Sequence, residues 1–195
     1  MISFLSRLFI KDRTNYNDST VRKKYGTLTG ITGIFLNICL FAGKFIAGIV
    51  TGAISITADA FNNLSDAGSS IITLIGFRLS GQAPDPEHPF GHGRMEYISG
   101  LLVSVAILVM GFELIVTSIG KLRNPKPIES STVVFVILIA SILVKLYMFY
   151  YNRSLSKKLE SAAMKATSAD SLSDTVATTL VLAATLISKY TGLLL

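Results

Sequence analysis

Charged residues are scarce in this chain of 195 residues. They make up 15% of the sequence, whereas soluble domains carry about a quarter, and half of the residues are hydrophobic. The mean hydropathy of +0.56 and this low charge exclude an ordinary soluble domain, and the apolar content excludes a disordered chain. The single cysteine, Cys39, excludes a disulfide framework. The composition indicates a polytopic membrane protein.

The sequence also lacks the strict alternation of β-strands and any obvious internal repeat. It has instead long apolar stretches, each meeting the roughly 20 residues that a bilayer-crossing helix needs. Five such stretches cover about 28–51, 54–79, 97–120, 131–151 and 162–187. Only a Gly52-Ala53 turn separates the first two, which predicts a helical hairpin. The predicted fold class is all-α: a polytopic transmembrane helix bundle with five full spans and the start of a sixth.

The net charge of +6 would suit a nucleic-acid partner, but the positions of the basic residues explain it differently. Twelve of them lie in the N-terminal tail, the second–third loop and the fourth–fifth loop, and four lie on the opposite side. Because loops rich in Lys and Arg stay in the cytoplasm, we predict a cytoplasmic N-terminus. The surplus charge then serves topology and contact with the lipid bilayer, and no nucleic-acid partner is expected.

The sequence divides into two segments. Residues 1–25 form a cytoplasmic N-terminal segment, for which an interfacial amphipathic helix and a disordered tail are both open interpretations. No basic region precedes its apolar part and no small-residue cleavage site follows, which argues against a signal peptide. Residues 26–195 form the transmembrane domain, which contains all the predicted spans. The ending Thr191-Gly192 followed by three leucines resembles a turn and a new helix, so we expect a chain truncated before or within a sixth span.

Acidic and amide side chains stand inside two of the apolar spans. There an ionisable group costs several kcal/mol unless it is paired, hydrated or metal-bound. In the second span Asn62 and Asp66 lie one turn apart, within about 40° of each other on a helix. In the fifth span Asp170 and Asp174 have the same spacing. Asp66 and Asp174 also fall near the middle of their spans, the depth at which transporters bind their substrates.

Three carboxylates and an amide oxygen at one depth repel one another unless a cation or protons join them. A single oxygen-rich divalent-metal site explains all four residues, while the alternative is that the aspartates bond to neighbouring helices or line a wet groove. Asp59, nearer the outer end, is expected to pack or to face water. Because no His or Cys lies in this cluster, hard cations are favoured, Mn²⁺ first and then Fe²⁺, Co²⁺ and Mg²⁺.

Both histidines of the chain lie in the second–third loop. Asp85, His88 and His92 offer three metal ligands from one short segment. The alternative is a solvated turn, since the loop is rich in Pro and Gly. Metal binding on this cytoplasmic side would serve capture or regulation.

Two lysines also lie inside predicted spans. Lys44 and Lys145 each stand within about two turns of a span end, so we expect their ammonium groups to snorkel to the interface. Lys44 and Glu113, both in the outer third of their spans, are a candidate ion pair.

These motifs resemble those of the cation diffusion facilitator family. The likeness covers nearly the whole chain: the run GAISITADAFNNLSD from Gly52 to Asp66, the loop DPEHPFGHG from Asp85 to Gly93, and the acidic pair of the fifth span. The resemblance implies six transmembrane helices, a homodimer of the full-length form, and export of divalent metal from the cytoplasm in exchange for protons. Members usually carry a sixth span and a cytoplasmic C-terminal domain, and this chain is expected to lack both.

The resemblance also implies the site residues. It selects Asn62 over Asn63, which helical geometry leaves open. Zinc-transporting relatives usually place a histidine in the quartet, whereas an all Asn and Asp set is similar to the manganese-exporting branch. The implied transport site is Asn62, Asp66, Asp170 and Asp174, and the implied loop site is Asp85, His88 and His92.

The predicted function is therefore Mn²⁺/H⁺ antiport by alternating access, and the resemblance implies that residues 26–195 are a transmembrane cation-efflux domain. We expect a multi-pass protein of a bacterial plasma membrane, with no resident cofactor and no enzymatic activity. An exporter of Zn²⁺, Fe²⁺ or Co²⁺ and a non-transporting metal-binding transmembrane fragment are the alternatives. An intramembrane aspartyl protease also uses aspartates from two helices, but the paired spacing and Asn62 favour a metal site.

Overall fold

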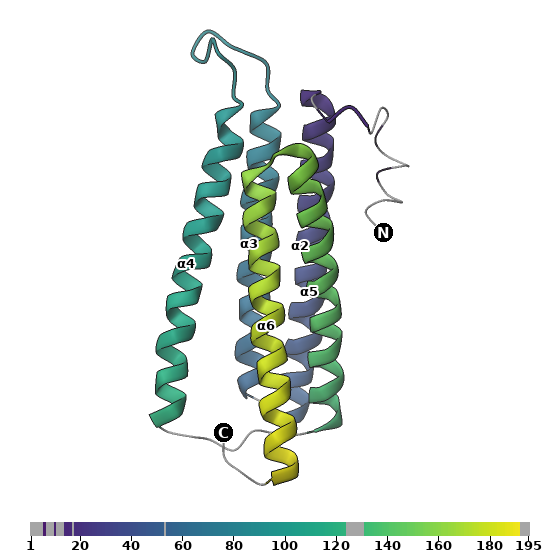
Figure 1. Ribbon diagram of the computed structural model, residues 1–195, viewed down its shortest axis with the longest axis vertical. Helices are drawn as coiled ribbons and strands as arrows, with labels where there is room; N and C mark the ends of the chain where they lie inside the picture. The colour runs from purple at the N-terminus through teal and green to yellow at the C-terminus, as the bar shows by residue number, and fades with distance from the viewer. Residues whose placement is uncertain are drawn as a thin grey trace.

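The computed structural model is a bundle of long helices running side by side (Figure 1). It describes Ser6, Ile10 and residues 14–16, 18–52, 54–123 and 131–191. No strand occurs in this described part, so the predicted all-α class is confirmed for it. Its helices are α2 (Ser19–Thr51), α3 (Ile54–Ser80), α4 (Arg94–Arg123), α5 (Thr132–Leu159) and α6 (Ala162–Thr191).

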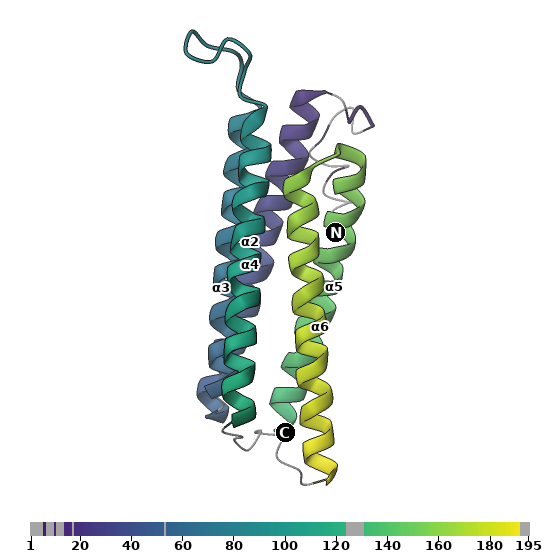
Figure 2. The ribbon, with the colours of Figure 1, turned by 60° about the vertical axis from the view of Figure 1, so that its left-hand side comes forward.

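Four helices of the described part are long and apolar enough to cross a membrane: α2, α4, α5 and α6. The helix α3 has similar length and runs beside α2 along the bundle in both views (Figures 1 and 2), but its many Ser, Thr, Asn and Asp residues make it less apolar. The count of five full spans therefore stays a prediction. The expected sixth helix and about half of the N-terminal segment fall on residues outside the described part, while residues 19–25 of that segment belong to α2.

The first hairpin has clear local causes. α2 begins before the predicted span because Asp18 caps it, accepting hydrogen bonds from the backbone N–H groups of Thr20 at 2.7 Å and Val21 at 3.2 Å. These bonds lower the pKa of the Asp18 carboxyl below its usual value. The helix ends at Thr51, and Gly52 caps it with a left-handed φ of 73°, which suits glycine. The predicted hairpin of these two helices is confirmed with Gly52 in its turn, while Ala53 lies outside the described residues.

The two ends of the bundle differ. We call the end that carries the 81–93 loop the loop end; it also holds the start of α2 and the short α5–α6 connection (Figure 2). That connection turns at Glu160, which has a φ of 47°. The opposite end, called the far end, holds the α2–α3 turn and the end of α6. Most basic residues predicted to be cytoplasmic therefore share the loop end.

Packing joins two hairpins and one outer helix. α2 packs on α3, α5 packs on α6, and α4 contacts α3 and α6. Near the loop end Gly26 lets α2 approach α3, because a Cβ there would lie 2.0 Å from the ring of Phe77. Arg22 of α2 donates hydrogen bonds to the buried Glu96 of α4 at 2.9 Å and to the Leu159 carbonyl that ends α5. Near the loop end, α2 is thus joined to α3, to α4 and to the end of α5.

Candidate metal-binding sites

Three of the four acids and amides predicted to meet inside the bundle do so. Asp66 comes from α3, and Asp170 and Asp174 come from consecutive turns of α6. Each offers a carboxylate oxygen, and these oxygens all lie within 4.8 Å of one another. Asp66 is 3% exposed, Asp170 is also buried, and Asp174 is half-buried. We call these three residues the aspartate triad.

The side chain of a lysine lies between carboxylates of the aspartate triad, an arrangement that was not expected from the sequence. The Nζ atom of Lys145 on α5 lies 2.7 Å from Oδ2 of Asp66 and 2.6 Å from Oδ2 of Asp174. Its side chain is 3% exposed, so the expectation that it snorkels to the interface is wrong. The reason is that two charge-assisted hydrogen bonds inside the bundle satisfy the ammonium without any reach to the surface.

The structure does not bring Asn62 into this cluster. Asn62 is exposed on α3, whereas the neighbouring Asn63 is 2% exposed and its Nδ2 donates to the Asp59 carbonyl at 3.0 Å. At 100° per residue, Asn62 lies about 40° to one side of Asp66 and Asn63 about 60° to the other. At this level of α3 the buried side is the one that carries Asn63.

A second intramembrane ion pair lies toward the far end. Nζ of Lys44 is 2.8 Å from Oδ2 of Asp59, which joins α2 to α3. The expected pair of Lys44 with Glu113 is therefore wrong, and Glu113 is exposed on α4. Asp59 is half-buried, and it belongs to neither group of potential metal ligands found in the described part.

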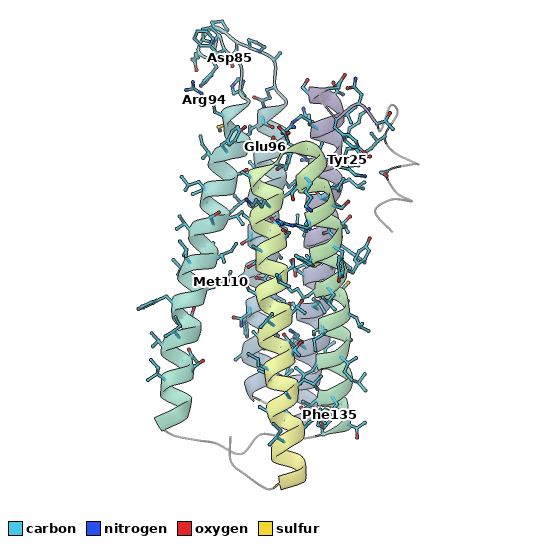
Figure 3. The ribbon with its side chains drawn as sticks, in the orientation of Figure 1. Tyr25, Asp85, Arg94, Glu96, Met110 and Phe135 are labelled. Carbon is cyan, nitrogen blue, oxygen red and sulfur yellow. The ribbon has the colours of Figure 1, made fainter. Side chains whose placement is uncertain are left out.

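The loop residues also come together. Asp85, His88 and His92 each place a ligand atom within 4.8 Å of the others. Oδ1 of Asp85 accepts a hydrogen bond from the His88 backbone N–H at 2.6 Å and lies 3.1 Å from Nδ1 of His88, while Nε2 of His92 is 3.5 Å from Oδ2. Gly91, with a φ of 76°, turns the chain so that His92 faces back. Figure 3 shows Asp85 in the loop beyond the helix ends.

The surroundings of Asp85 in this loop favour its negatively charged form, which can bind a cation. The backbone N–H of His88 lowers the pKa of Asp85, against a smaller opposing effect of burial, and the His88 side chain adds to the lowering. Because this pKa is lowered, the stabilisation that the carboxylate gives the turn is present at neutral pH and decreases as pH falls through the lowered pKa. The loop therefore offers one anionic oxygen and two imidazole nitrogens.

A small cavity lies between the aspartate triad and the loop end. Its volume is about 10 Å³, which is room for about one water molecule. Ser70, one turn from Asp66 along α3, is part of its wall. The lining residues come from α2, α3, α5 and α6, and they are Thr29, Gly30, Gly33, Ser70, Thr73, Tyr151, Asn152 and Thr167.

Comparisons with known proteins show which proteins this chain is similar to. A family model described as the cation efflux transmembrane domain matches residues 30–194. The manganese efflux system protein MneS of Bacillus subtilis (strain 168) is 31% identical over 151 residues, which are 77% of this chain and 52% of that protein. MneP of the same organism, also a manganese efflux system protein, is 28% identical over 156 residues, covering 80% of this chain and 52% of MneP.

Another similar protein is named as a transporter of zinc rather than manganese. The mitochondrial proton-coupled zinc antiporter SLC30A9 of Homo sapiens is 39% identical over 106 residues, which are 54% of this chain and 18% of that protein. The chain spans about half the length of the bacterial manganese efflux relatives that it matches.

Proposed function

The chain belongs to the cation efflux family, and from this premise we propose that it binds a divalent metal ion at the aspartate triad and carries it across a membrane. The resemblance to this family and to its manganese-exporting branch is confirmed by the family match and by the likeness to MneS and MneP. The chain is a multi-pass integral membrane protein with apolar helices, and its family is one of transporters rather than enzymes. The observation that carries the proposal is the meeting of three carboxylates from α3 and α6 inside the bundle.

Manganese is the proposed cargo. Asp66, Asp170 and Asp174 supply only oxygen ligands, which suit hard cations better than Zn²⁺. The two manganese efflux relatives support this choice, and the zinc antiporter SLC30A9 keeps Zn²⁺ as the alternative. Asn62 stays the proposed fourth ligand of the metal-bound state. Asn62 and Asp66 are about 40° apart on α3, so a rotation of the helix by about 20° would place them on either side of the direction that Asp66 holds here.

The proposed mechanism is alternating access. Metal enters from the loop end, past the small cavity that Ser, Thr, Tyr and Asn residues help to line, and binds the aspartate triad. The helices then rock so that the site opens to the far end, where protons compete with the metal for the same carboxylate oxygens. The basic residues at the loop end favour its placement in the cytoplasm, together with the N-terminus. We further propose that the working form is a homodimer in a bacterial plasma membrane.

The test is a panel of metals offered to the full chain in proteoliposomes. We expect Mn²⁺ to move faster than Zn²⁺, Fe²⁺ and Co²⁺, and we expect an opposing proton flux that a trapped pH dye reports. Faster Zn²⁺ than Mn²⁺ transport would overturn the choice of metal. Metal binding without flux of any ion would instead support a non-transporting metal-binding fragment, and metal-free peptide cleavage would support the protease.

The loop site makes a separate prediction. We propose that Asp85, His88 and His92 bind a second metal ion that feeds or regulates transport. Asp85→Ala should lower the number of Zn²⁺ ions bound per chain by one, measured by equilibrium dialysis and metal analysis, because the loop loses its anionic ligand. Efflux at saturating metal should persist.

Glu87→Ala is the matched control, because Glu87 is an exposed acid of the same loop that is absent from the ligand group. Its bound metal should equal that of the unmodified chain. An unchanged metal count in Asp85→Ala would show that the loop is a solvated turn.

A further inference from the structure

The ammonium group of Lys145 lies where a bound cation would bridge the aspartate triad. It is within hydrogen-bond distance of Asp66 on α3 and Asp174 on α6, at 2.7 Å and 2.6 Å. We propose that Lys145 is a tethered internal cation: it holds the triad together while no metal is bound, and an incoming divalent ion must displace it. This inference rests on the proposed function of the triad as the metal site.

Distance is the first argument for displacement. A divalent ion bound to the same two carboxylate oxygens would sit at about 2.0–2.6 Å from each of them. It would then lie within a few ångströms of Nζ of Lys145, which touches the same Oδ2 atoms of Asp66 and Asp174. Two positive charges at that separation repel strongly in a buried site. The ammonium and the metal ion cannot both bridge the pair.

Burial is the second argument, because it makes the lysine necessary when metal is absent. Asp66 and Lys145 are each 3% exposed, so water does little to compensate their charges. Removing one partner of a buried ion pair leaves the other charge uncompensated, which is strongly destabilising. Lys145 therefore serves the metal-free state, and the metal ion takes over its role when it binds.

The helix that carries Lys145 offers a place for the displaced ammonium. Ser141 lies one turn before Lys145 on α5, toward the far end, and its buried Oγ has no hydrogen-bond partner among the described residues. On α2, the antiparallel register that sets Gly33 beside Ser70 and Lys44 beside Asp59 puts Asn37 level with Asp66. The Oδ1 atom of Asn37 is also buried and unpaired within the described part of the chain. Two unpaired oxygen atoms thus lie near the depth of the triad and could accept hydrogen bonds from the displaced ammonium.

The test measures Mn²⁺ affinity of the purified full chain in detergent by titration calorimetry. Lys145→Met should bind Mn²⁺ about tenfold more tightly or better, because the metal no longer displaces an ammonium held by two charge-assisted bonds. Its stabilisation by Mn²⁺ in thermal unfolding should also exceed that of the unmodified chain. Lys145→Arg keeps the positive charge and should show no gain in affinity.

Lys44→Met is the matched control, because Lys44 is the other buried lysine that pairs with an aspartate within the bundle. Its Mn²⁺ affinity should equal that of the unmodified chain. If Lys145→Met does not fold without metal, Lys145→Gln provides the second variant. Folding of either variant only in the presence of Mn²⁺ supports the inference, whereas failure of both to fold with Mn²⁺ makes Lys145 a structural residue and overturns it.

A variant of the triad itself separates the two proposals. If Asp174→Asn binds Mn²⁺ as tightly as the unmodified chain does, the triad is not the metal site and the proposed function fails. If Asp174→Asn loses binding while Lys145→Met binds no more tightly than the unmodified chain, the proposed function stands and the inference about Lys145 is wrong.

Discussion

Asp66→Asn and Asp174→Asn are each expected to reduce Mn²⁺ efflux from loaded vesicles to nearly the rate of protein-free liposomes. Each change removes one of three anionic ligands that meet in the bundle and keeps the shape of the side chain. Loss of groups that merely orient a metal ligand costs about 10–100-fold in metal affinity or activity. Loss of a direct ligand should therefore cost more than about a hundredfold.

Glu113→Gln is the control for this pair of variants. It also neutralises an acid inside an apolar helix, but Glu113 is exposed on α4 and is not part of the triad. Its efflux should match that of the unmodified chain, with all chains reconstituted at equal amounts and checked for helix content by circular dichroism. Unchanged efflux in both aspartate variants would place the transport site elsewhere.

The sequence predicted the helices and most of the aspartate cluster because both depend on local patterns. Long apolar runs require helices in a bilayer, and an i, i+4 spacing puts two side chains on one helical face. Equal depth in two spans then suggested that Asp66 and Asp174 meet, and the structure brings them together. The hairpin turn at Gly52 followed from equally local information.

Lys145 was misjudged because an apolar stretch is shorter than the helix that contains it. The predicted span ended at 151, which put Lys145 near its end, but α5 continues to Leu159. It continues because Leu155 and Leu159 belong to the buried core at the loop end. Measured on the whole helix, Lys145 lies at the middle, and that position was the signal for an internal partner.

The choice between Asn62 and Asn63 and the partner of Lys44 depend on tertiary packing. Two adjacent positions on a helix differ by about 100°, and which one is buried depends on where the neighbouring helices lie. The Lys44–Asp59 pair requires the register of α2 on α3, which close contact between Gly26 and Phe77 helps to set. None of this is encoded in the periodicity of a single helix.

Gly100→Ala is expected to destabilise the fold, because Gly100 lies where α4 contacts α6 most closely among its described glycines. Gly100 of α4 is buried, and a Cβ there would lie 2.9 Å from the backbone nitrogen of Ala163 in the first turn of α6. Backbone atoms cannot turn aside as a flexible side chain does, so Gly100→Ala must push the two helices apart. Such overpacking costs about 1–3 kcal/mol of folding free energy. We expect a lower midpoint of thermal unfolding in detergent.

Gly111→Ala is the same substitution on the same helix and should act in the opposite direction. No atom beyond its own helix lies within 4 Å of the Cβ that it would add, and replacing a mid-helix glycine by alanine stabilises a helix by about 0.5–1 kcal/mol. An equal rise in both variants would contradict the close approach of α4 to α6. Since α6 carries Asp170 and Asp174, a loosened α4 should also lower Mn²⁺ efflux in Gly100→Ala but not in Gly111→Ala.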